Sequence, residues 1–161
     1  MKYIIIIVLS ILTFQITNAS DFKGARDDNS FLNSKNSDFK KGKNALKKAT
    51  KYEKKNKTKK KNNHFEKAIK YFVSAHKDEP NNIEILKNLG LSYYKIGDLF
   101  MSEIYYSEGL VMDPTNNFIN QELGKLYFET KRINLAKKRL EVLFSCNCKE
   151  YLDLLKIIEK N

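Results

Sequence analysis

Apolar side chains recur every three or four positions along most of the chain, and short polar stretches separate these runs. In residues 83–96, Leu86, Leu89 and Tyr93 fall on one helical face, and Gly90 lies among them. Such spacing is typical of amphipathic α-helices. A further apolar run ends at Pro114, since the residue before a proline is disfavoured in the α region. The pattern predicts an all-α protein.

The pattern also repeats along the chain at a constant interval: Leu89-Gly90 matches Leu123-Gly124, and Tyr93 matches Tyr127. Within each unit a turn separates two apolar runs. Gly97-Asp98 is the turn of the first unit, because glycine commonly ends a helix and aspartate caps the next one. Each unit is therefore predicted to be a pair of antiparallel helices.

Glycine inside a helix costs about 1 kcal/mol relative to alanine, so Gly90 and Gly124 need compensation. Small residues at matching places of the second helices, such as Ser102, would allow two backbones to approach closely. We therefore expect packing to offset the glycine cost. The residues predicted to form this packing are Leu89, Gly90, Tyr93, Ser102, Tyr106, Leu123, Gly124, Tyr127, Ala136 and Leu140.

These positions resemble the tetratricopeptide repeat (TPR) family, whose 34-residue pattern carries Leu-Gly, Tyr, Ala, Phe and Pro in order. Residues 83–116 and 117–150 each match one repeat, with Asn120, Leu143 and Cys148 departing from the pattern. The resemblance implies a TPR-like α-solenoid of about two and a half to three repeats. Residues 151–161 would form a C-terminal capping helix with a charged outer face, anchored by Leu154 and Ile157.

Residues 38–82 are predicted to form a divergent first helix pair with a lysine-rich insertion. If Tyr52 takes the place of Tyr93, seven extra residues lie in "KKNKTKKKNN", which we expect to be a loop between the helices. Asn63, with Glu66 three residues on, would then cap the second helix. Residues 20–37 are rich in Asp, Asn and Ser, which predicts disorder.

Residues 1–19 have the order of a secretory signal: Lys2, an apolar run over residues 3–14, and short residues up to Ala19. The run is shorter than the roughly 20 apolar residues of a membrane-spanning helix. We expect cleavage after Ala19 and export, to the periplasm of a bacterium. An uncleaved membrane anchor and a buried core helix are the alternatives.

The formal net charge of +11 lies entirely in residues 40–61, which hold twelve lysines against Glu53 alone. Such a segment attracts anionic surfaces: a membrane, lipopolysaccharide or nucleic acid. The stretch "KKNKTKKKNN" has no arginine and no aromatic residue for base stacking, which argues against nucleic acid. A solvated loop is the other interpretation.

Opposite the packing side of each first helix lies a second face that the TPR resemblance implies to be a concave groove for a peptide. Its apolar members, such as Tyr94 and Phe128, have no packing role within their own unit, and exposed apolar patches mark contact sites. The predicted groove residues are Glu84, Lys87, Leu91, Tyr94, Lys95, Phe118, Gln121, Lys125 and Phe128.

A partner protein or peptide would occupy this groove; covering by the amino-terminal segment, a neighbouring helix or a second copy of the chain is the alternative. Some family members hold a terminal carboxylate with a lysine-and-asparagine clamp. Lys87 fits that clamp, but Leu91 and Gln121 do not, so recognition of a chaperone tail is not expected.

Cys146 and Cys148 stand one residue apart, and a disulfide, free thiols, and an intermolecular bond or metal all remain open. The two histidines lie in another unit. The sequence has no nucleophile with a base, no glycine-rich phosphate loop and no metal-ligand cluster. We therefore expect no enzyme activity, no cofactor and no bound metal.

Overall fold

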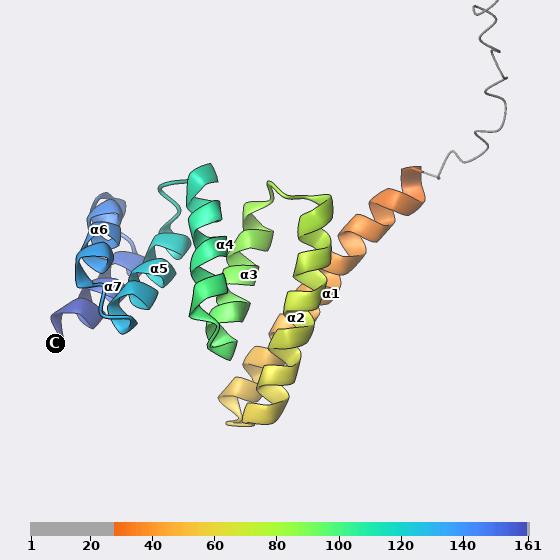
Figure 1. Cartoon of the computed structure of the whole chain (residues 1–161), viewed down its shortest axis with the longest axis horizontal. Coiled ribbons are helices and arrows are strands. Elements are labelled where there is room, and N and C mark those ends of the chain that lie inside the picture. The colour runs from red at the N-terminus through yellow and green to blue at the C-terminus, as the bar shows by residue number, and fades with distance from the viewer. Residues whose placement is uncertain (1–27, 161) are drawn as a thin grey trace, which may run out of the picture.

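The computed structural model describes residues 28–160, and every described element is a helix (Figure 1). Consecutive helices pair as hairpins, α1 with α2, α3 with α4 and α5 with α6, and α7 packs on both α5 and α6. The prediction of an all-α solenoid is confirmed. The elements are α1 (Asp28–Lys54), α2 (Thr58–Asp78), α3 (Ile83–Ile96), α4 (Leu99–Met112), α5 (Asn117–Glu129), α6 (Ile133–Leu143), a 3-10 turn (Phe144–Cys146) and α7 (Lys149–Glu159).

Helix α1 begins at Asp28, so the predicted disorder of residues 20–37 is wrong for residues 28–37. A polar stretch can continue a helix cheaply once packed residues have nucleated it, and the packed part of α1 includes Phe39, Gly42 and Ala45. Residues 20–27 and the predicted signal peptide at residues 1–19 lie outside the described residues. No described helix is both long enough and apolar enough to cross a bilayer.

The first hairpin is longer than the others. A Cβ placed on Gly42 would strike the ring of Phe72, and a Cβ on Gly90 would strike the ring of Tyr106. Gly42 is therefore the counterpart of Gly90, and Ala45 stands where Tyr93 stands in the next unit. The chain from Gly42 to Phe72 is longer than that from Gly90 to Tyr106 by about four helical turns, at about 3.6 residues per turn. The prediction of seven extra residues, with Tyr52 in the place of Tyr93, is wrong: the insertion is twice as long.

The insertion lengthens the two helices instead of forming a loop. Helix α1 continues to Lys54, and α2 already begins at Thr58, so Asn63 lies inside α2 and does not cap it. Divided over the two arms, the insertion adds about two helical turns to each arm. Because the added length is a whole number of turns, the side of each helix that faces its partner is the same at the tip as in the packed part. In Figure 1 the hairpin tip reaches past the neighbouring ends of α3 and α4.

Short polar side chains cap the later helices. Asn82 accepts from the amides of Glu84 and Ile85 at 3.0 and 3.3 Å, and Asp98 accepts from the amide of Met101 at 3.1 Å. Gly97 ends α3 with φ +89°, a conformation that costs glycine little. The predicted turn at Gly97-Asp98 is confirmed.

The core contains the small-residue contacts that the repeat pattern predicts. Ser102 is fully buried, and its hydroxyl donates to the carbonyl of Gly90 at 2.9 Å. Of the ten predicted packing residues, Tyr93, Tyr127 and Leu140 are half-buried and the others are buried. Two apolar clusters result, one joining the first hairpin to α3 and one joining α4 to α5.

Helix α7 closes the C-terminal end of the stack. Leu154 is fully buried and takes the space above Gly124, where a Cβ would meet its side chain. The outer surface of α7 is not wholly charged as predicted, because Leu152 is 62% exposed.

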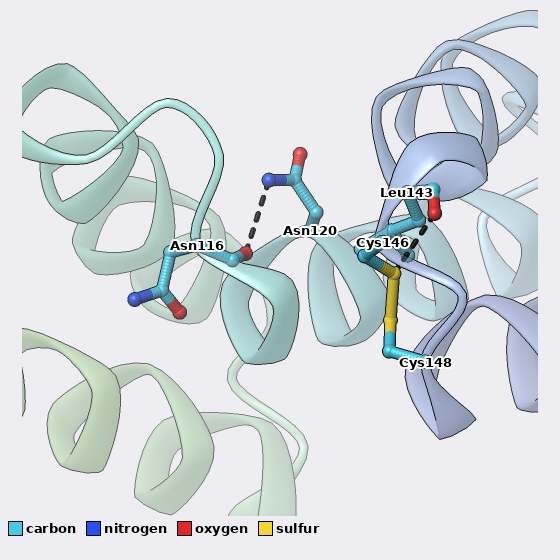
Figure 2. The surroundings of a disulfide bond; sticks show 5 residues. All are labelled: Asn116, Asn120, Leu143, Cys146 and Cys148. Carbon is cyan, nitrogen blue, oxygen red and sulfur yellow. Dashed lines mark hydrogen bonds between the residues drawn. A yellow bond between two sulfur atoms is a disulfide. The ribbon is translucent and has the colours of Figure 1, made fainter.

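Asn120, which departs from the TPR pattern, is buried with its polar atoms satisfied. Its Nδ2 donates to the carbonyl of Asn116 at 3.0 Å (Figure 2) and to that of Pro114 at 2.9 Å. Its Oδ1 accepts from Arg139 at 3.2 Å. Polar pairing thus replaces the usual bulky residue. Of the alternatives open for the cysteines, the structure has the disulfide between Cys146 and Cys148, at the junction of α6 and α7 (Figure 2).

Candidate functional site

The predicted groove residues come from α3 and α5, two first helices that contact each other. All nine are half-buried: each has one side on the protein and one toward solvent. We call this surface the first-helix face. It consists of Glu84, Lys87, Leu91, Tyr94, Lys95, Phe118, Gln121, Lys125 and Phe128.

Tyr94 is the best-anchored aromatic residue of the first-helix face. Its hydroxyl donates to the carboxylate of Glu129 on α5, and the ammonium of Lys125 lies 5.8 Å from its ring centroid. Burial, followed by the hydrogen bond to Glu129, raises the pKa of Tyr94 above its ordinary value. The ring is therefore neutral and held in place before any ligand arrives.

Phe118 has a second role that the sequence did not reveal. Its ring packs edge-on against the buried ring of Tyr106 at 6.5 Å, and the ammonium of Lys87 lies 5.2 Å from its centroid. Phe118 packs against the cluster of Tyr106, Ile119 and Leu123, so the expectation that it has no packing role is wrong. Phe118 thus links the first-helix face to the core.

Polar contacts extend the first-helix face to its neighbours. Lys95 pairs with Glu53 of α1 at 3.0 Å, and the side-chain amide of Gln121 donates to Asp153 of α7 at 3.3 Å. Helices α1, α3, α5 and α7 are therefore joined through side chains along this side of the molecule. Glu53 and Asp153 were not predicted as site residues, and no local sequence pattern indicates them.

All three lysines of the first-helix face already have an acidic partner. Lys87 pairs with Glu84 and Lys125 with Glu122, each at 2.9 Å, while Lys95 pairs with Glu53. Further carboxylates are present at Glu129 and Asp153. All three lysines of the face are therefore committed. With Glu84 on the face and Glu53, Glu122, Glu129 and Asp153 beside it, five carboxylates stand against three ammonium groups.

The lysines of residues 40–61 occupy a different place, on α1, on α2 and at the turn between them. We call these residues the basic hairpin. Among its twelve lysines, only Lys41 makes an ion pair within the described residues, with Asp38 at 2.8 Å. Glu53, its one acidic residue, is taken by Lys95. The positive charge of the basic hairpin is therefore almost uncompensated.

The stacked hairpins and the face along their first helices define a TPR-like helical solenoid. Solved TPR domains share this fold: the second TPR domain of human RPAP3 in complex with an HSP70 peptide has a TM-score of 0.60 at 18% identity, covering 79% of this chain and 99% of that domain. The first TPR of Spaghetti (RPAP3), bound to the HSP90 peptide SRMEEVD, has a TM-score of 0.57 at 20% identity, covering 76% and 93%. The Arabidopsis OM64 TPR domain has a TM-score of 0.52 at 15% identity, covering 76% and 98%.

Within that class, the chain belongs to the family described as "Uncharacterized protein conserved in bacteria (DUF2225)", whose model matches residues 18–113. The matched residues include the whole of the first two hairpins described above and therefore the basic hairpin. No curated protein matches the sequence significantly.

Proposed function

We propose that the protein is a non-enzymatic interaction scaffold that binds an extended or helical segment of a partner protein on the first-helix face. The observation that carries the proposal is the position of Tyr94 and Phe128, large half-buried aromatic residues on adjacent first helices. Buried aromatic anchors supply most of the energy at protein interfaces. RPAP3 domains of the same fold are bound to peptides.

The charge of the first-helix face bears on the kind of peptide. The HSP90 peptide SRMEEVD and the HSP70 peptide SGPTIEEVD, which the RPAP3 domains bind, both end in EEVD and are acidic there. In this chain Lys87, Lys95 and Lys125 are already paired, and binding an acidic tail would require breaking those pairs among surplus carboxylates. We therefore propose a ligand with apolar anchor residues and no net negative charge.

The test uses peptides selected from a displayed random library on the full chain, with affinities measured by fluorescence anisotropy. Changing Tyr94→Ser and Phe128→Ser together should weaken the selected peptides about tenfold or more, because truncating an aromatic anchor commonly costs about 2 kcal/mol or more. The peptide SRMEEVD should bind no better than a scrambled sequence.

The matched control is Phe100→Ser with Val111→Ser, which removes two apolar side chains that are 73% and 83% exposed on α4. This variant should bind the selected peptides like the unchanged protein. Both variants should keep their helical circular dichroism. Equal affinity of the Tyr94/Phe128 variant and the unchanged protein would rule out the first-helix face.

We also propose that the domain acts outside the cytoplasm, in the periplasm. The support is the order of residues 1–19: one lysine, an apolar run and short residues before Ala19. Amino-terminal sequencing of protein recovered from the periplasm of a bacterial host should then begin at Ser20.

A second candidate function is attachment to an anionic surface through the basic hairpin. The observation that favours it is the added length of both arms, whose tip reaches beyond the ends of α3 and α4 (Figure 1). The lysines at this tip make no ion pair with any described residue. Such binding should fall steeply between low and moderate salt. It should also weaken when residues 49–62, which hold seven of the twelve lysines, are deleted, a change considered further in the Discussion.

A further inference from the structure

A cleft of about 290 Å³ lies between α1 and α2, part-way along the basic hairpin. Its polar lining comes from Lys41, Asn44 and Lys48 of α1 and from His64, Lys67 and Tyr71 of α2. Lys67 and Tyr71 are two residues away from Ile69, which packs on the core, and two residues correspond to about 200° around a helix. The cleft therefore opens on the far side of α2 from that core contact.

The lining is composed of cations and hydrogen-bond donors. None of the lining side chains is acidic. Lys41 shares its charge with Asp38, but Lys48 and Lys67 make no ion pair within the described part of the chain. The amide of Asn44 and the hydroxyl of Tyr71 add uncharged donors. Such a group of side chains offers an anion both positive charge and several hydrogen-bond donors.

His64 is held in a fixed orientation at this cleft. Its ring stacks on that of Tyr52, with centroids 5.2 Å apart and planes 8° apart, and the ammonium of Lys60 lies 5.7 Å from the Tyr52 centroid. Its Nδ1 is buried without a hydrogen-bond partner among the described residues. Burial, then Lys67 and Lys48, lower the pKa of His64 from its usual value. A buried polar atom without a partner is costly unless something completes it.

We propose that the cleft binds a phosphate group, with Lys48 and Lys67 as its principal charge partners and His64 as a further donor. Two free ammonium groups beside a histidine match a phosphate dianion better than a singly charged carboxylate. The volume is at the lower limit of small-molecule sites. The ligand is therefore a phosphate or a small phosphate ester, either free or as the headgroup of a lipid.

This inference does not depend on the first-helix face. It narrows the second candidate function to one defined site, on the flank of the basic hairpin and not at its tip. Occupation of the cleft should raise the pKa of His64, because a nearby anion favours the imidazolium form over the neutral ring.

The experiment follows the two histidine rings of the full chain by NMR while inorganic phosphate is added at constant ionic strength. The resonances of His64 should shift and saturate, and its pKa should rise. His76 lies further along α2, where its ring centroid is 5.9 Å from that of Tyr105. It serves as an internal control, and its resonances should not shift. Equal shifts of both rings, or none, would overturn the proposal.

Matched double variants separate the cleft from general attraction. Lys48→Met with Lys67→Met should weaken phosphate binding about tenfold or more, since hydrogen bonds between charged groups are strong. Lys55→Met with Lys57→Met at the tip, and Lys137→Met with Lys138→Met on α6, remove the same charge and should change it less than twofold. If all three variants lose affinity equally, the cleft proposal is wrong, although the basic hairpin could still bind anionic surfaces.

Two further arms identify the source of the phosphate. One uses vesicles of phosphatidylcholine with phosphatidic acid, and the other uses phosphatidylcholine alone. If the protein sediments only with the vesicles that contain phosphatidic acid, and the Lys48→Met/Lys67→Met variant does not, the ligand is a lipid headgroup. If the protein binds free phosphate but sediments with neither vesicle, the ligand is a soluble ester. Absence of both kinds of binding contradicts the inference.

Discussion

At the scale of single residues, the contact between Gly90 and Tyr106 controls how closely α3 and α4 approach. The ring of Tyr106 lies over the glycine and is fully buried, so moving it aside would displace the residues packed around it. Because Ser102 bonds to the carbonyl of the same glycine, two independent contacts fix this crossing. The glycine is retained because a methyl group would occupy the place of an aromatic ring.

We predict that Gly90→Ala lowers the free energy of unfolding by about 1–3 kcal/mol, the usual cost of overpacking a core. Combined with Tyr106→Leu, which vacates part of the space, the same change should cost much less, giving a coupling of about 1 kcal/mol or more. Denaturant titration of the unchanged protein, the two single variants and the double variant measures this coupling energy.

Gly97→Ala is the control for this cycle. It should also destabilise, by about 1 kcal/mol, because its φ of +89° disfavours a side chain. Nothing lies within 4 Å of a Cβ at this position, so its effect should add to that of Tyr106→Leu without coupling. Coupling of similar size at both glycines would contradict the packing argument.

The sequence could predict these residue-scale contacts because the repeat places Gly90 on the packing side of its helix. The same periodicity placed Tyr94 and Phe128 on the opposite side. It could not indicate Glu53 and Asp153, whose partners lie 42 and 32 residues away in the chain. Pairing over such distances depends on how the hairpins stack, which local spacing does not encode.

At the scale of helices, the basic hairpin departs most from expectation. Its stretch "KKNKTKKKNN" lacks the apolar periodicity from which the other helices were predicted. The pairing of Gly42 with Phe72 reveals the insertion length only once the packing is seen. Once the packed parts of α1 and α2 have formed, each helix can extend by further turns that make few core contacts of their own.

We predict that deleting residues 49–62 leaves a folded protein. The deletion brings Gly42 and Phe72 to the spacing of Gly90 and Tyr106 and removes about two turns from each arm. Stability should fall moderately, since buried Ala49 and the stack of Tyr52 on His64 are lost. Helical circular dichroism and a single cooperative thermal transition test this expectation.

Deletion of residues 51–60 is the informative comparison. Removing five residues per arm makes each helix end about 140° around its axis from the present end, so the two ends no longer face each other across the turn. This shorter deletion should therefore be the more damaging one, with a non-cooperative or much lower transition. If the two deletions behave alike, the insertion does not consist of whole turns.

At the scale of the whole molecule, each hairpin contacts mainly its neighbours, so stability should vary along the stack. Helix α7 covers the end that would otherwise expose the apolar face of α5. Its buried Leu154 contacts Gly124, while Leu152 on the same helix points outward. Two leucines on one short helix thus differ widely in burial.

We predict that Leu154→Ala costs about 2–5 kcal/mol, as for other buried leucines. Hydrogen exchange should show amides of α5, α6 and α7 losing protection while those of α1 and α2 keep theirs. Leu152→Ala is the matched control, because it makes the same substitution on the same helix at an exposed position. It should change the free energy of unfolding by no more than about 0.5 kcal/mol. Uniform loss of protection across all helices would contradict nearest-neighbour stabilisation.

The whole-turn insertion in the first hairpin also affects how this protein can diverge. A segment that grows or shrinks by complete turns changes its reach without altering a single core contact elsewhere. Mutation can therefore vary how far the charged end extends from the body at little risk to folding. Reach becomes an independently adjustable trait, whereas the spacing of the remaining hairpins stays fixed by their glycines.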